Sequence, residues 1–194
     1  NVAVGSGALA SNVTCHSSVA IGSGALAAFD GGNIGNVHED GSVAIGTNAL
    51  GAATTGSSNV AMGRQAGVSV TSSGQNTIIG CRAGEGITSG TGRNVLIGNL
   101  AGNAVTGRDN VMVGAQAGQY STGTTSGDQL TMIGSYVKSD SATGDSQIVI
   151  GYDATGYSTN YVVLGISATD IVVPMTGTNW SNPSDERIKK DIET

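Results

Sequence analysis

The chain has 194 residues and a formal net charge of −6, with only 8 lysines and arginines. These cations do not cluster before residue 187, which argues against nucleic acid or an anionic membrane as a partner. No apolar run approaches the roughly 20 residues that a membrane-spanning helix needs, so we expect no membrane insertion. Aromatic residues make up only 4% of the chain while glycine occurs 32 times, so large side chains for a core are scarce.

A five-residue motif recurs ten times and organises the sequence. The glycines that close the copies fall 17, 24, 17, 17, 18, 16, 20, 17 and 14 residues apart. A period this short predicts a solenoid, because one unit is too small to bury its own apolar face. The copies are Asn1–Gly5, Ser18–Gly22, Ser42–Gly46, Asn59–Gly63, Asn76–Gly80, Asn94–Gly98, Asn110–Gly114, Leu130–Gly134, Gln147–Gly151 and Tyr161–Gly165.

Each copy predicts a short strand, since three β-forming residues are bounded by Asn or Ser and by Gly. The central residue faces one side of the strand and its two neighbours face the other. That centre is Ala in the first four copies and a larger residue in the last six. The closing Gly suits a corner with positive φ or close backbone approach. A unit of about 17 residues has room for two short strands and two turns, but not for a helix. We therefore predict an all-β fold, a parallel β-roll or β-helix-like solenoid of about ten coils.

The predicted solenoid is thin, and each coil supplies few large apolar groups. A lone chain of this composition would struggle to offset its backbone entropy. Oligomerisation is a common remedy for a sparse core. We therefore expect several copies of the chain to assemble side by side or intertwined.

Five tyrosines lie in the second half of the chain, and four of them are candidate binding residues. An exposed Tyr offers a flat apolar face with a polar tip, which suits stacking on sugars or on protein. The alternative is that a widening core needs larger side chains there, in step with the larger strand centres. The binding candidates are Tyr120, Tyr136, Tyr152 and Tyr157, and the fifth is Tyr161.

An insertion over residues 30–40 contains His38, Glu39 and Asp40, which could suggest a metal site. Sequential neighbours rarely converge on one ion, so we expect a solvated loop with neither metal nor cofactor. The 10 acidic residues of positions 1–184 show no pairing of the kind that glycoside hydrolysis needs. We therefore expect no turnover enzyme in the body, which weighs against a polysaccharide-cleaving spike.

The repeat ends after Gly165, and we divide the chain into three parts. Residues 1–170 form the repetitive solenoid body, and 171–184 form a closing strand and linker that includes Trp180. The last ten residues, 185–194, hold seven of the 22 charged residues. Ser184 as an N-cap and Ile188 and Ile192 at i, i+4 spacing predict the start of a helix there.

The stretch Asn182–Ile192 resembles the junction that leads into the C-terminal intramolecular chaperone of phage tailspikes and tail fibres. In that family the chaperone assembles the trimer and is then released by self-cleavage. The resemblance implies a cut between Ser184 and Asp185, with Ser184 as nucleophile and Lys189 as its assistant. A Lys that loses its proton by desolvation can activate a hydroxyl in this way. The resemblance also implies that 185–194 begin a chaperone domain and that cleavage requires the full-length chain.

The Asn/Ser-Val-Ala-Ile-Gly unit also resembles the head repeats of trimeric autotransporter adhesins, which form trimeric β-rolls. Together the two resemblances imply a homotrimer that attaches to a cell-surface receptor, either a glycan or a protein. The chaperone-like junction favours a phage tail fibre or tailspike, assembled in the host cytoplasm and carried on the virion. The head of a trimeric bacterial surface adhesin is the alternative.

Overall fold

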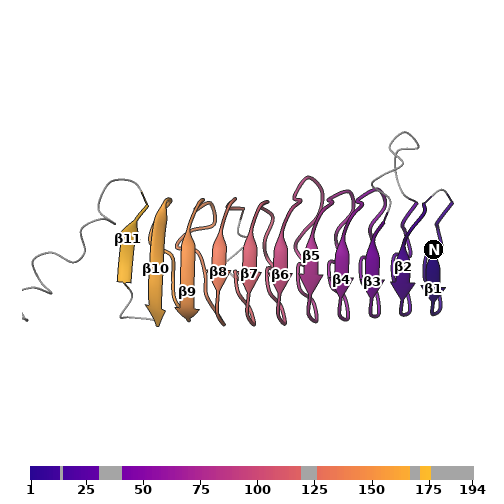
Figure 1. The fold of residues 1–194 in the computed structure, drawn as a ribbon, viewed down its shortest axis with the longest axis horizontal. Coiled ribbons are helices and arrows are strands. Elements are labelled where there is room, and N and C mark those ends of the chain that lie inside the picture. The colour runs from indigo at the N-terminus through magenta and orange to yellow at the C-terminus, as the bar shows by residue number, and fades with distance from the viewer. Residues whose placement is uncertain (14, 31–40, 119–125, 167–170, 176–194) are drawn as a thin grey trace, which may run out of the picture.

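The computed structural model describes residues 1–13, 15–30, 41–118, 126–166 and 171–175. In this part of the chain, eleven strands form a single sheet whose spatial order is the order of the sequence (Figure 1). The strands are β1 (Val2–Val4), β2 (Val19–Ile21), β3 (Val43–Ile45), β4 (Val60–Met62), β5 (Thr77–Ile79), β6 (Val95–Ile97), β7 (Val111–Val113), β8 (Thr131–Ile133), β9 (Ile148–Tyr152), β10 (Tyr161–Ile166) and β11 (Ile171–Pro174).

The predicted parallel β-solenoid is confirmed. Strands β1 to β10 pair in parallel, each with the next copy of the motif, and the chain makes one turn of the solenoid between them. The register places each strand centre on the next, as in Ile78 on Leu96 and Leu96 on Met112. The closing strand expected after the last repeat is β11, which pairs antiparallel with β10.

The unit length has room for two strands, but the described coils do not form a second named strand. Each described coil contributes one named strand to the sheet, and the return path is built from turns. Those turns still bond coil to coil through the main chain. The Gly67 amide donates to Ala83 at 2.9 Å, and the Gly84 amide donates to Ala101 at 2.8 Å. Left-handed residues such as Arg82 (φ 55°) interrupt extended geometry in the return path, which still keeps its inter-coil hydrogen bonds and forms an isolated parallel bridge between Lys138 and Thr155.

The core is a narrow column inside the coils, and its large residues change position along the rod. Early coils pair a small strand centre with a large turn residue, as in Ala44 with Leu50, and both are fully buried. The coils of β5 to β7 reverse this arrangement. Leu96 fills the strand centre, and a Cβ at Gly102 would lie 2.7 Å from its Cδ2 atom. The change from Ala to larger strand centres is therefore an exchange of volume between two positions, not a widening of the core.

The glycines that close the strands form a column of close backbone contacts. Gly98 has φ 135°, a conformation that L side chains rarely adopt. A Cβ at this position would lie 2.6 Å from the carbonyl carbon of Gly114 in the next coil, with the carbonyl oxygen closer still. This confirms the predicted corner, which needs both positive φ and close backbone approach.

A buried asparagine ladder runs along the start of the strands. The Asn76 side-chain oxygen accepts from the Asn94 backbone amide at 3.0 Å, and the Asn94 oxygen accepts from the Asn110 amide at 3.0 Å. The Asn94 amide group donates in turn to the carbonyls of Thr91 and Gly107, both at 3.2 Å. The Asn94 side chain thus satisfies main-chain groups of its own coil and of the next, which would otherwise be buried without partners.

Replacing Gly98 by Val should destabilise the fold by roughly 1–3 kcal/mol per chain. The reason is that a β-branched residue must adopt a strained φ and collide with the Gly114 carbonyl. Chemical denaturation measures the loss. Gly90→Val is the control, since Gly90 also has positive φ but open space around it. Equal losses in the two variants would contradict the collision and leave only backbone strain.

Replacing Asn94 by Ala should cost about 1–3 kcal/mol, because the buried Asn110 amide loses its acceptor. The free energy of unfolding measures this. Asn99→Ala is the matched control, because Asn99 is exposed and donates only to the Cys81 carbonyl. Two variants of similar stability would show that the ladder does not stabilise the solenoid.

Candidate receptor-binding and assembly surfaces

The outward face of the sheet is an apolar strip. The residues on either side of each strand centre point away from the core, and nearly all are Val, Ile, Met or Leu. Even in the middle of the rod they stay accessible, with Met62 41% and Ile133 40% exposed. The strip runs from β1 to β10, and among its described residues only Val162 of β10 is buried. Continuous apolar surfaces of this kind mark interaction sites.

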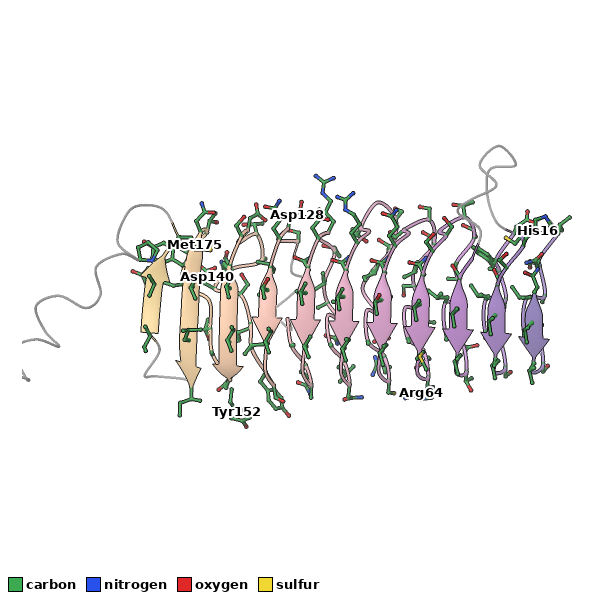
Figure 2. All side chains as sticks on the ribbon, in the orientation of Figure 1. His16, Arg64, Asp128, Asp140, Tyr152 and Met175 are labelled. Atoms are coloured by element: carbon green, nitrogen blue, oxygen red, sulfur yellow. The ribbon has the colours of Figure 1, made fainter. Side chains whose placement is uncertain are left out.

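The described tyrosines form two separate pairs. Tyr136 and Tyr152 pack edge to face with ring centroids 6.0 Å apart, and Tyr157 and Tyr161 do the same at 5.1 Å. Tyr152 ends β9, whereas Tyr161 begins β10, so the pairs lie at opposite ends of the parallel strands. We call these ends the N-terminal edge, where strands begin, and the C-terminal edge, where they end. Tyr152 projects from the C-terminal edge, opposite Asp128 (Figure 2).

Three of the four tyrosine candidates are exposed at 45–60%: Tyr136, Tyr152 and Tyr157. They are not core residues, so the alternative of a widening core does not account for them. The structure does not bring them into one binding surface, because Tyr157 lies with Tyr161 at the other edge. Tyr120 lies outside the described residues. A binding role for these tyrosines stays a prediction.

The N-terminal edge carries ion pairs between successive coils. Arg93 donates to Asp109 through both Nε and Nη2, the latter at 2.8 Å, and Arg108 donates from Nε to Asp128 at 3.1 Å. The hydrogen bond from Arg93 holds the pKa of the Asp109 carboxyl below its usual value, so this carboxyl stays charged near neutral pH. These side chains are well exposed, so each pair adds little stability. Their effect is to fix the position of the guanidinium groups.

Motifs within a single unit do not reveal this edge, because the partners of Arg108 and Asp109 lie one coil away. The signal was available in the spacing. Arg93 and Asp109 are 16 residues apart, and Arg108 and Asp128 are 20 apart, which are the separations of the corresponding strand-closing glycines.

Several predicted residues lie outside the described part of the chain. They include the junction residues Ser184, Asp185 and Lys189, the helix start that follows them, Trp180, and the loop with His38, Glu39 and Asp40. The expected cleavage and the expected solvated loop therefore stay predictions.

Within the described ranges, no three His, Cys, Asp or Glu side chains gather in a way that could hold a metal ion. The same part of the chain has no helix of the length and apolarity needed to cross a membrane.

Comparison of the chain with protein family models, with curated proteins and with solved structures finds no match.

Proposed function

We propose that this chain is the shaft and host-attachment segment of a homotrimeric phage tail fibre or tailspike. The observation that supports assembly with other copies of the chain is the apolar strip on the outward face of β1 to β10. The solenoid fold suits a structural and adhesive role, since it extends in one dimension and presents a long side surface. The receptor would be a cell-surface glycan or protein.

The strip fits other copies of the same chain better than an unrelated partner. The side chains of the strip repeat along the rod at the spacing between hydrogen-bonded strands, about 4.8 Å. A second copy laid parallel presents the same side chains at the same spacing over the same length, so the strips match from end to end. Burial of apolar surface contributes roughly 25 cal/mol per Å² to the free energy of association. A strip of ten strands can bury such surface over its full length. The number three comes from the two family resemblances, and three strips facing a common axis would cover one another.

Such an assembly would also stiffen the shaft. Each coil contacts only its neighbours, so a single solenoid is held together by consecutive contacts along the chain. Copies packed side by side would add lateral contacts at every level. A fibre that transmits force between a virion and a cell surface needs this lateral support.

The phage assignment rests on the junction Asn182–Ile192, and the head of a bacterial surface adhesin is the second candidate. The repeat unit supports both, since it resembles the adhesin head repeats as well. The junction separates the two because only the phage family releases its chaperone by self-cleavage.

Replacing Ile97 by Asp should dissociate the assembly. Ile97 lies on the outward face of β6, so the variant places a charge in the strip without changing the core. A buried charge should raise the dissociation constant by at least about a hundredfold, or about 2.7 kcal/mol. Light scattering measures the mass, which should be three times 19.1 kDa for the unchanged chain. Asn99→Asp, two residues later and beyond the corner, should leave the trimer intact. A folded monomer before any substitution would refute the proposal.

In a chain that continues beyond Thr194, self-cleavage should leave a product that ends at Ser184. Mass spectrometry of the purified product tests this. Ser184→Ala should abolish the cut, because the hydroxyl nucleophile is lost, and Lys189→Ala should slow or block it. Cleavage that persists in Ser184→Ala, or a mature end elsewhere, would remove the reason to prefer the phage fibre over the adhesin.

A further inference from the structure

A polar groove lies along the N-terminal edge, between the loops that lead into β4, β5 and β6. It has a volume of about 380 Å³, and Arg108 from the following coil contributes to its lining. Its lining consists of Ser, Thr, Gly, Gln and Arg and contains no aliphatic or aromatic residue. The groove is separate from the apolar strip, which is formed by the strands themselves.

The walls of the groove are held in a fixed register. Ser58, Gln75 and Arg93 occupy the same place in three successive coils, with φ of 59°, 63° and 63°. Each directly precedes a buried asparagine of the ladder, and that neighbour fixes the position of its backbone. The coil spacing places these three side chains in a row, about 4.8 Å from one to the next.

The floor is equally fixed. The Ser73 side chain is buried, donates to the Thr88 carbonyl at 2.7 Å and accepts from the Thr91 amide at 3.0 Å. Gly90 borders open space, since a Cβ there would meet no atom within 4 Å. The hollow is therefore bordered by loops that are hydrogen-bonded to one another.

The groove holds unused hydrogen-bonding capacity. Within the described residues, the hydroxyls of Ser57, Ser58 and Ser72 and the amide group of Gln75 make no side-chain hydrogen bond. Arg93 directs Nε and Nη2 to Asp109, and Arg108 directs Nε to Asp128, which leaves other guanidinium N–H groups available. The surface thus offers donors and acceptors at short, regular intervals.

The charge of the groove is balanced. Its two cations are each paired with a carboxylate from the next coil, and the lining itself contains no carboxylate. A polyanion is recognised by cations that are not already neutralised. An apolar ligand would find no apolar side chain in the lining. A neutral polyhydroxylated chain, whose hydroxyls both donate and accept, matches this surface.

We propose that the groove binds a neutral oligosaccharide, laid along the rod across the coils of β4 to β6. The proposal deepens the host-attachment role proposed above, because it supplies the chemical class of the receptor. A site that relies on hydrogen bonds without aromatic stacking binds weakly by itself. Three parallel copies of the chain would present three such grooves to one cell surface, and simultaneous attachment would raise the overall affinity.

The test is chemical-shift mapping of the isotope-labelled chain with neutral hexasaccharides of glucose, galactose and mannose, and with a heparin hexasaccharide. At least one neutral probe should shift the amide signals of Ser58, Gln75 and Arg93. Gln75→Ala should weaken that binding about three- to tenfold, the loss of a hydrogen bond. Ser72→Leu should abolish it, because an aliphatic side chain fills the groove and cannot bond to hydroxyls.

Gln129→Ala is the matched control. Gln129 has the same left-handed conformation (φ 61°) and also precedes a strand, but it lies outside the groove. It should bind the sugar as the unchanged chain does. The proposal is overturned if no neutral probe shifts the groove signals, if the heparin probe binds more tightly, or if the shifts map to Tyr136 and Tyr152 instead.

Light scattering on the same samples separates this proposal from the one on which it rests. A monomer that binds the neutral probe at the groove would refute the trimer and retain the sugar site. A trimer that leaves the groove signals unshifted would do the reverse.

Discussion

Close main-chain contact between successive coils is the constraint on which the rest of this structure depends. Parallel strands must lie about 4.8 Å apart, and here that spacing is maintained around the coil, in the turns as well as the strands. Where backbones come closest, at the corner after each strand, a Cβ does not fit, and a column of glycines results. Where a strand begins, buried amides need acceptors, and the asparagine ladder supplies them. The core can remain narrow because so much of the cohesion is main-chain hydrogen bonding.

The sequence was sufficient to predict the strands, their parallel order and the glycine corners, because all three follow from a repeat that returns in register. It was insufficient for the return path of each coil. Length alone allowed a second strand there, but left-handed residues such as Arg82 keep the backbone turning while it still bonds to the next coil. The exchange of volume between Ala44 with Leu50 and Leu96 with Gly102 was also hidden. The two positions of each pair are six residues apart in the sequence, and they come into contact only in the folded coil.

The candidate sites also differ in how much of them can be predicted from the sequence. Residue type left exposure of Tyr136, Tyr152 and Tyr157 open against packing in the core, and the structure decides for exposure. Their separation into two pairs at opposite edges also required the strand ends to be placed. The polar groove could not be found by scanning for motifs. Each of its loops, taken alone, is an ordinary stretch of Ser, Thr and Gly that indicates a turn. Only stacking of three such loops creates a hollow with aligned hydroxyl and amide groups.

The exchange of core volume has a consequence for how such a rod can change its length. In the coils before β4 the larger of these two residues lies on the turn, and in the coils of β5 to β7 it lies on the strand. The coil of β4 has a small residue at both places, Ala61 and Gly67, and the space beside Gly67 is filled by Leu50 from the coil before and Ile78 from the coil after. This coil is an adaptor between two interior patterns. Whole coils could be gained or lost by recombination on either side of it with the interior unchanged, whereas loss of the adaptor would force Leu50 and Ile78 into the same volume.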